Sequence, residues 1–220
     1  MSKNERIAAH KLETLARMSR EFYRRGWMWG TSGNLSVKIQ DEPRYFAITA
    51  SGVSKSELTE QDIVVVEVGS NDPLSVRPVV PTRSKPSAEA SIHAAIYDGV
   101  PKAGAVFHVH TISSTLVSDA EKEGEALTYL RVPAYEMTKG WGMPHAAEAR
   151  VPLFHNWPDV ERIAGDVKRY LTDPPLVPVL IVRGHGVTVW GKDMEQAKNH
   201  LEIAEFIFQL MWQKSLASKR

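Results

Sequence analysis

The sequence contains no cysteine, which excludes a disulfide framework and leaves histidine and carboxylate side chains as the ligands for any transition metal. It also has little net charge, because 27 lysines and arginines face 26 acidic residues and the formal net charge is +1. That balance gives no electrostatic reason to expect nucleic acid or an anionic membrane as a partner. A search for a metal site therefore begins with the eight histidines.

A second absence is that of a long apolar run. No segment approaches the roughly 20 apolar residues that a membrane-spanning helix needs. Residues 1–18 are charged and amphipathic, without the apolar core of a signal peptide. We therefore expect a cytoplasmic protein with no membrane partner. The sequence has no internal repeat, and its proline-bearing stretches at 68–87 and 171–178 are loop-sized, so we expect one domain over residues 1–220.

The sequence does contain interspersed helix and strand patterns. Helical spacing of apolar residues predicts helices near 7–22, 87–99, 157–170 and 193–211, with Ser87 as one N-cap, Pro158 in a first turn and an Asp193–Gln196 capping box. Runs rich in β-branched and aromatic residues predict strands at 45–50, 62–68, 103–109 and 176–182. Because strands and helices do not alternate strictly, we predict an α/β fold with a mixed sheet between helices, rather than a TIM barrel or a doubly wound sheet.

The run AVFHVH at 105–110 reads as a buried strand but carries two histidines. Residues i and i+2 of a strand point to the same face, so His108 and His110 project together. Neutral imidazole is a common ligand for zinc and similar ions, and a catalytic zinc site uses three protein ligands and one open position. His185, between two glycines at the end of an apolar run, is the third candidate.

The same pattern has a simpler interpretation, in which the two strand histidines are a hydrogen-bonded pair that binds no metal. Three histidines would also hold cobalt, manganese, iron or nickel as well as zinc. His10 and His200 fall in amphipathic helices, where we expect surface residues. The residues alone leave these alternatives open.

Several short motifs occur in one order: GTSGNLSV (30–37), ITASGVSK (48–55), KPSAEASIH (85–93), HVHT (108–111) and RGHGVTVWG (183–191). Together they resemble the class II aldolase/adducin family over nearly the whole chain. The resemblance implies a mixed, largely antiparallel sheet sandwiched by helices and a homotetramer. It also implies one zinc ion per subunit, held by His108, His110 and His185.

The segment PAYEMTKGWG (133–142) is similar to a stretch of the branch of this family that dehydrates 5-methylthioribulose 1-phosphate in methionine salvage. The resemblance implies loss of a proton at carbon 3 and of the hydroxyl at carbon 4, giving 2,3-diketo-5-methylthiopentyl 1-phosphate. An aldolase or epimerase acting on fuculose or ribulose phosphate is the main alternative. A non-catalytic scaffold like the adducin head is a third hypothesis, which the three retained histidines disfavour.

The resemblance also assigns individual roles. Glu136 is the expected general acid/base, and Glu89 is expected to have a secondary role, in proton transfer or as a zinc ligand without substrate. Aldolases of the family usually have two serines before that glutamate, whereas this chain has Ser87 and Ala88. The sugar phosphate is expected to bind at small hydroxyl- and glycine-containing turns, through Asn34, Ser51, Gly52, Lys55 and Ser87. Any one of these loops, taken alone, is ordinary turn chemistry, and a neighbouring chain is expected to complete the site.

Overall fold

A computed structural model describes residues 3–42, 44–80, 84–120, 126–145, 147–173, 175 and 177–218. The helices and strands follow in the order α1 (Lys3–Arg24), β1 (Asn34–Gln40), β2 (Tyr45–Thr49), η1 (Glu60–Asp62), β3 (Ile63–Val68), β4 (Val76–Pro78), α2 (Ala90–Gly99), β5 (Ala105–Val109), α3 (Ile112–Asp119), β6 (Leu127–Val132), η2 (Glu136–Trp141), β7 (Ala149–Phe154), α4 (Val160–Tyr170), β8 (Val179–Val182), β9 (Gly186–Gly191) and α5 (Met194–Ala217). η1 and η2 are short 3-10 helices. None of the described helices is long and apolar enough to cross a membrane.

In the part of the chain that the structure describes, the strands form one sheet in the order β4-β3-β2-β1-β5-β9-β8-β7-β6. Neighbouring strands are antiparallel except β7 and β8, which are parallel. The predicted mixed, largely antiparallel sheet is therefore confirmed. The strands near 45–50, 62–68, 103–109 and 176–182 all lie in it.

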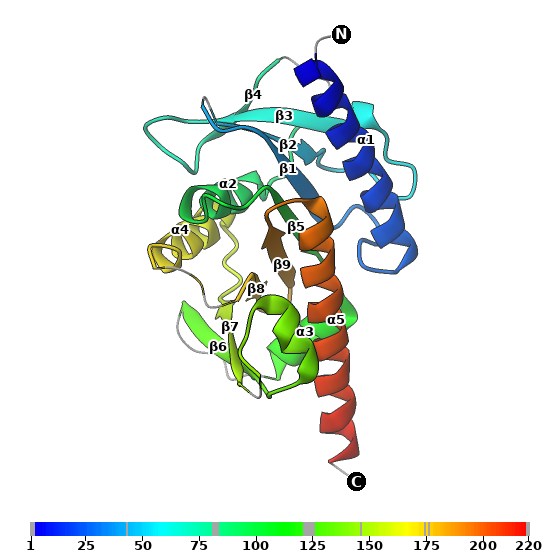
Figure 1. Cartoon of the computed structure of the whole chain (residues 1–220), viewed down its shortest axis with the longest axis vertical. Helices are drawn as coiled ribbons and strands as arrows, with labels where there is room; N and C mark the ends of the chain where they lie inside the picture. Colours follow the sequence, from blue (N-terminus) through cyan, green and yellow to red (C-terminus); the bar gives the residue numbers. More distant parts are fainter. Residues whose placement is uncertain are drawn as a thin grey trace.

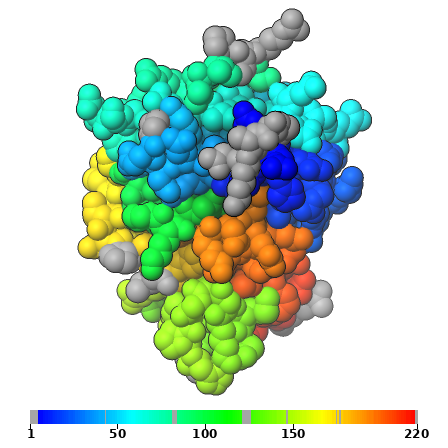
Figure 2. All heavy atoms as spheres, turned by 45° about the horizontal axis from the view of Figure 1, so that its top comes forward, coloured from blue at the N-terminus to red at the C-terminus, as the bar shows by residue number. Residues whose placement is uncertain are grey.

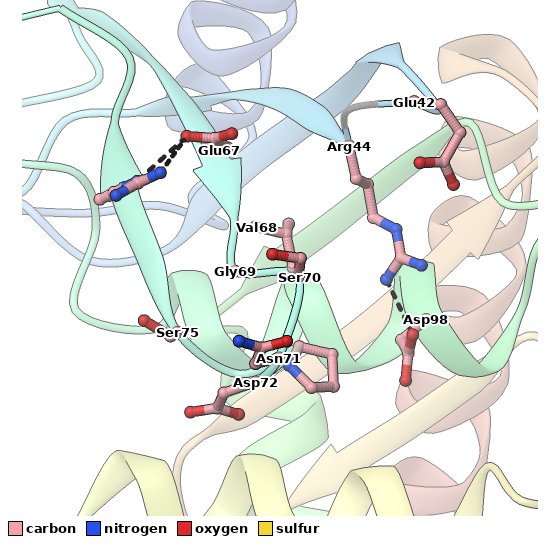
Figure 3. Close-up of a pocket in the computed structure, with 12 residues that line it drawn as sticks. Glu42, Arg44, Glu67, Val68, Gly69, Ser70, Asn71, Asp72, Ser75 and Asp98 are labelled. Carbon is pink, nitrogen blue, oxygen red and sulfur yellow. Dashed lines mark hydrogen bonds and ion pairs between the residues drawn. The ribbon is translucent and has the colours of Figure 1, made fainter.

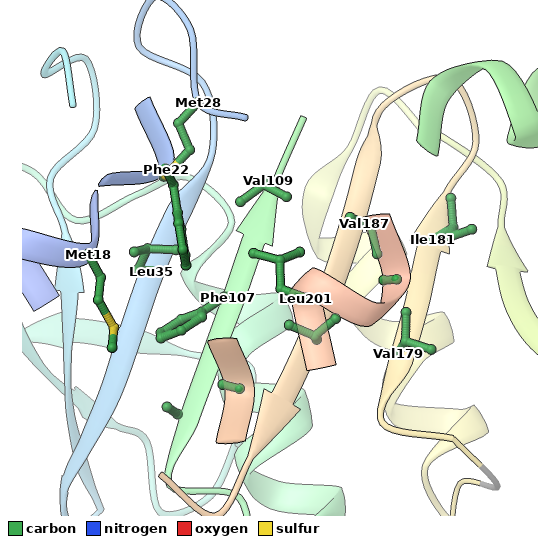
Figure 4. Packing of buried hydrophobic residues seen from close by; sticks show 14 of the residues in the cluster. Met18, Phe22, Met28, Leu35, Phe107, Val109, Val179, Ile181, Val187 and Leu201 are labelled. Carbon is green, nitrogen blue, oxygen red and sulfur yellow. The ribbon is translucent and has the colours of Figure 1, made fainter. Parts of the chain in front are cut away.

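Helices cover both faces of the sheet, as predicted (Figure 1). One layer contains α1 and α5, whose apolar faces pack on Leu35, Phe107 and Val187 (Figure 4). The opposite layer contains α2 and α4, which pack against each other and against Phe46, Ile48 and Val106. Residues of β5 thus alternate between the two cores, with Phe107 and Val109 facing α1 and α5 while Val106 faces α2.

The observed helix starts confirm one predicted cap and differ from the prediction in two details. Asp193 caps α5 by accepting a hydrogen bond from the Gln196 backbone N–H at 2.8 Å, as predicted. Asp159 caps α4 in the same way, so Pro158 precedes that helix instead of lying in its first turn. Ser87 is not the N-cap of α2. The helix begins at Ala90, and the Ser87 hydroxyl accepts the Glu89 backbone N–H in the preceding turn.

The sheet order determines which residues can meet. β5 lies between β1 and β9, and the end of β5 lies beside the start of β9, where Val109 is opposite Val187. Figure 2 shows another face of the molecule, where the first turns of α5 (orange) lie below α1 (blue) and the yellow-green segment that includes η2 protrudes beneath them. The η2 segment packs on α5, whereas β5 lies within the sheet between β1 and β9.

Candidate metal centre

Three imidazole rings meet at the junction of β5 and β9. The ring centroids of His108 and His110 are 4.8 Å apart. The ring centroid of His185 lies 5.0 Å from that of His108 and 4.5 Å from that of His110. The rings are nearly perpendicular to one another, at 78° to 85°. Residues separated by more than 70 positions in the sequence therefore present their ring nitrogens to one small volume. The predicted meeting of His185 with the strand pair is present in the structure.

Backbone geometry makes this meeting possible at Gly186. A Cβ atom on this residue would lie 2.4 Å from the Val109 carbonyl oxygen and 2.9 Å from Cε1 of His108. Glycine therefore lets β9 approach the end of β5 and leaves room for the imidazole. The hydroxyl of Thr188, directly opposite His108 in the sheet, lies 2.9 Å from Nδ1 of that ring. This contact fixes the ring orientation and directs Nε2 toward the cluster.

A carboxylate completes the group. Glu89 lies in the turn before α2, and its Oε1 is 3.1 Å from Nε2 of His185 and 3.4 Å from Nε2 of His108. Its second oxygen, Oε2, accepts a 2.5 Å hydrogen bond from the amide of Asn34. Asn34 is directly opposite His108 on β1. The four predicted residues Glu89, His108, His110 and His185 place donor atoms within 4.8 Å of one another.

Burial sets the ionisation of this group. It lowers the pKa of His108 to about 4 and that of His110 to about 3, because desolvation disfavours the charged imidazolium. Burial alone would raise the pKa of Glu89, but the His108 and His185 imidazoles and the Asn34 amide outweigh it, and this pKa lies well below its usual range. At neutral pH the two strand imidazoles are therefore neutral and the carboxylate is ionised. These are the forms in which both groups bind metal ions.

The donor set fits a divalent metal ion. Glu89 Oε1, His108 Nε2 and His110 Nε2 are buried and make no hydrogen bond within the described residues. Unpaired buried polar atoms are costly, so three of them aimed at one point indicate a missing partner. Three imidazoles and one carboxylate are ligands that zinc and neighbouring transition metals accept.

Three loops that sequence analysis linked to phosphate binding also converge beside this cluster. Ala50 forms a β-bridge with Pro86, and the Ser51 backbone N–H donates to the Lys85 carbonyl at 2.9 Å, which joins the 50–53 loop to the 85–89 loop. Asn34 joins the 30–34 loop to the 85–89 loop through its hydrogen bond to Glu89. The exposed residues Ser51 and Gly52 lie at the tip of their loop, and Gly52 has a φ of +73°, which favours glycine.

Lys55 is expected to help bind the phosphate, but its ammonium does not reach the surface. Its side chain is buried, with 1% exposure, and its ammonium donates to the Thr31 and Val53 carbonyls, both at 2.9 Å. Burial lowers its pKa to about 8, although the nearby Glu89 carboxylate acts in the opposite direction. The ammonium therefore lies beneath the loops, bonded to their backbone.

A separate cavity of about 550 Å³ lies between the β3–β4 hairpin and the end of α2 (Figure 3). Its lining includes Arg44, which pairs with Asp98 at 2.8 Å, and Arg77, which pairs with Glu67 at 2.8 Å. These charges already neutralise each other in pairs. None of the cavity's lining residues belongs to the histidine cluster, so we place the functional site at the cluster.

Comparison with known proteins identifies the family. Residues 13–212 match the family described as "Class II Aldolase and Adducin N-terminal domain". The chain belongs to the class II aldolase and adducin family. The resemblance noted from the motifs is thereby confirmed. Solved structures of class II aldolases share the fold: an L-fuculose 1-phosphate aldolase aligns with a TM-score of 0.74 and 21% identity, covering 94% of this chain and 87% of that one.

Curated relatives in this class II aldolase family indicate the branch. A protein of Microcystis aeruginosa named methylthioribulose-1-phosphate dehydratase is 44% identical over 90% of this chain and 93% of its own length. A protein of the same name from Geobacillus kaustophilus is 36% identical over 94% of this chain and 92% of its own. A structure of YgbL from Escherichia coli, a putative aldolase/epimerase/decarboxylase, has a TM-score of 0.74 at 24% identity, covering 94% and 90%.

Glu136, the predicted acid/base, does not join the cluster of its own chain. It starts η2, its side chain is 72% exposed, and its carboxylate pairs with Lys139 at 2.7 Å and lies 3.9 Å from His145. η2 packs on α5, where the Trp141 indole donates to the His200 carbonyl and Trp141 joins the α1–α5 core. His108 projects to the other face of the sheet, on the side of α2. Within the described residues, Glu136 is therefore not part of the group formed by Glu89, His108, His110 and His185.

Sequence reasoning missed two partners of the site. It did not identify Thr188 as the partner that orients His108, or Asn34 as a partner of Glu89. Both residues lie directly opposite His108 on the neighbouring strands, and register is not visible in a single sequence. His200, expected at the surface, is instead buried, with Nδ1 2.6 Å from the Trp190 carbonyl oxygen.

Proposed function

We propose that this chain is a metal-dependent hydro-lyase that converts 5-methylthioribulose 1-phosphate to 2,3-diketo-5-methylthiopentyl 1-phosphate in methionine salvage. The observation that carries the proposal is the cluster of three histidines and a carboxylate, in a chain 44% identical over 90% of its length to a protein named as that dehydratase. The motif EMTKG (136–140) supports the same branch.

We assign the metal as zinc, one per subunit, with His108, His110 and His185 as ligands. A zinc ion bound there supplies Lewis acidity to the sugar's carbonyl and hydroxyl oxygens, worth several kcal/mol in such sites. Glu89 lies close enough to ligate when substrate is absent, at 3.1 Å from His185 and 3.4 Å from His108. With substrate bound, its ionised carboxylate, held by Asn34, can accept a hydrogen bond or a proton from a sugar hydroxyl.

The reaction requires that a proton leave carbon 3 and that a hydroxide leave carbon 4 with a proton added to it. The enol that results then ketonises. We assign the proton transfer to Glu136, whose exposed carboxylate is not part of its own chain's cluster. A second copy of the chain, in the homotetramer that we propose, would therefore bring Glu136 to the histidine cluster. A positioned carboxylate contributes about 10²–10⁴-fold to such a step.

The phosphate is assigned to the converging loops. Asn34, Ser51, Gly52 and Ser87 offer an amide, hydroxyls and backbone N–H groups, the donors that anion sites use. Lys55 contributes the positive charge. The substrate class is thus a small sugar phosphate, in keeping with a net charge of +1 that favours neither nucleic acid nor a membrane surface.

Product analysis is the decisive experiment. Zinc-loaded protein is incubated separately with 5-methylthioribulose 1-phosphate and with L-fuculose 1-phosphate, and the products are identified by mass spectrometry. The proposal expects loss of 18 mass units from the first compound and no change in the second. Release of dihydroxyacetone phosphate from fuculose 1-phosphate, without dehydration of the other sugar, would replace the proposal by an aldolase function.

A mixing experiment tests the sharing of sites between copies. The variants Glu136→Gln and His108→Ala are each expected to be inactive. If the two variants are dissociated and reassembled together, some sites combine an intact cluster with an intact Glu136, and activity should return to a fraction of wild type. Mixed oligomers that assemble but stay inactive would contradict the assignment of Glu136 to a neighbouring copy.

A further inference from the structure

Lys55 is assigned above as the positive charge of the phosphate site, yet its ammonium is buried beneath the loops. Its ammonium donates to the carbonyls of Thr31 and Val53, each at 2.9 Å, and the side chain is 1% exposed. The two carbonyls belong to different loops, one that follows Gly30 and one that follows Gly52. A single side chain therefore joins two of the three loops that converge beside the cluster.

The loop tips and the Lys55 ammonium differ in their exposure to solvent. Thr31, Ser51 and Gly52, at the tips of the two loops, are exposed, whereas the ammonium lies buried beneath them. A Cβ atom on Gly30 or Gly52 would meet no atom within 4 Å, so the outer surface of both turns is open. The lysine thus lies on the inner side of the loops, and their backbone groups are presented outward.

This arrangement is costly for a purely structural link. A buried ammonium loses its hydration, and neutral carbonyls compensate only part of that loss. An ammonium has three N–H donors, of which the two carbonyls account for two. The Glu89 carboxylate raises the pKa of Lys55 and the Lys55 charge lowers that of His110, so the ammonium lies within electrostatic range of the cluster. A fixed positive charge beneath two open turns matches an anionic ligand above them.

We propose that Lys55 is a positioning residue for the phosphate site: it holds the 30–33 and 51–54 loops in one arrangement, and its buried charge favours the bound anion without reaching the surface. This inference rests on the proposed function, because it assumes that the loops bind the phosphate of a sugar phosphate. It assigns to Lys55 the preorganisation of the site, whereas the loop tips make the direct contacts.

The test compares Lys55→Met, which keeps the apolar stem and removes the charge, with Lys102→Met, an exposed lysine beyond α2. Zinc-loaded proteins are titrated with inorganic phosphate and the melting temperature is followed. Phosphate should stabilise wild type and Lys102→Met equally. Lys55→Met should need at least about tenfold more phosphate for the same stabilisation, with unchanged zinc content and a rise in KM that exceeds any fall in kcat.

Two outcomes would overturn the inference. One is a Lys55→Met protein that melts at a lower temperature but binds phosphate as wild type does, which would leave only a structural role. The other is a wild-type protein that phosphate does not stabilise at all. If Lys55→Met fails to fold, Lys55→Gln replaces it, since it keeps an N–H donor for the carbonyls but has no charge, and the same loss of phosphate binding is expected. Phosphate binding that depends on Lys55, in a protein that yields aldol products, would refute the dehydratase and leave this role intact.

Discussion

The histidine cluster and the η2 segment differ in almost every physical property. His108 is buried, the His108 and His110 imidazoles are neutral at pH 7, and glycine and threonine neighbours fix the geometry of the cluster. Glu136 is exposed, and its hydrogen bond to Lys139 lowers its pKa, so it is ionised at neutral pH. The histidine cluster assembles its donor atoms within a single chain. The Glu136 carboxylate instead lies exposed on the surface and is available to a neighbouring molecule.

The comparison teaches how such a site divides its work. Metal binding needs several donors held within a few ångströms of one another, and here the sheet order β1-β5-β9 brings the histidines together. Proton transfer needs one carboxylate that can approach and leave the substrate, which a surface segment can deliver. The four predictions below test this division, beginning with the largest expected effect.

Removal of one imidazole should abolish the cluster. In His108→Ala, the protein should lose its bound zinc and its dehydratase rate should fall by at least about 10³-fold, since the Lewis acid accounts for several kcal/mol of the barrier. Zinc is measured by mass spectrometry after dialysis, alongside the rate. The exposed His10→Ala serves as the control and should retain both. A fully active His108→Ala protein without metal would refute the site.

Removal of the η2 carboxylate should separate chemistry from metal binding. Glu136→Gln should lower kcat by about 10²–10⁴-fold while zinc content and melting temperature stay as in wild type, because the side chain is exposed and is not one of the four potential metal ligands. Glu148→Gln, an exposed glutamate before β7, is the matched control. Loss of zinc from Glu136→Gln would show that the two regions are not independent.

Much of this molecule follows from local sequence signals. The capped start of α5 and the central strands follow from short patterns, and the H-x-H spacing by itself places two imidazoles on one face. The position of His185 beside His108 and His110 does not follow from spacing in the sequence. It depends on β9 lying beside β5, a contact between residues nearly 80 positions apart. The strand-end pattern made His185 a candidate, and the family resemblance assigned it as a ligand.

The remaining features could not be predicted because they belong to the tertiary arrangement. In the sequence, the loops around Lys55 look like ordinary turns, and an isolated lysine gives no sign that it will be buried. Ser87 looked like a helix cap because a serine before an apolar run usually is one. Here the hydroxyl caps a preceding turn instead, and Glu89 is left free to point toward the histidines.

Acid should lower the free energy of unfolding through the buried His93, which is not one of the proposed metal ligands, as well as through the ligands themselves. His93 is fully buried, with Nδ1 2.7 Å from the Ser36 hydroxyl, and burial lowers its pKa from 6.5 to about 4. The unfolded chain then binds more protons between these two values, so the stabilisation is present above pH 6.5 and is lost as pH falls toward 4. This one group should contribute a decline of about 3 kcal/mol in the free energy of unfolding. Chemical unfolding of metal-free protein at several pH values should show a shallower decline for His93→Gln, whereas His10→Gln should follow wild type.

The smallest expected effect tests whether the cluster depends on backbone space. Gly186→Ala would place a Cβ atom 2.4 Å from the Val109 carbonyl oxygen and 2.9 Å from the His108 ring, so β9 must move away from β5. We expect a loss of about 1–3 kcal/mol in stability together with weaker zinc binding. Gly165→Ala in α4 is the matched control, because a Cβ atom there meets nothing within 4 Å and alanine favours a helix by about 1 kcal/mol. The two substitutions should therefore shift the melting temperature in opposite directions, and only the first should change zinc affinity. Equal zinc binding in both variants would mean that the rings, rather than the strand approach at Gly186, determine the geometry of the cluster.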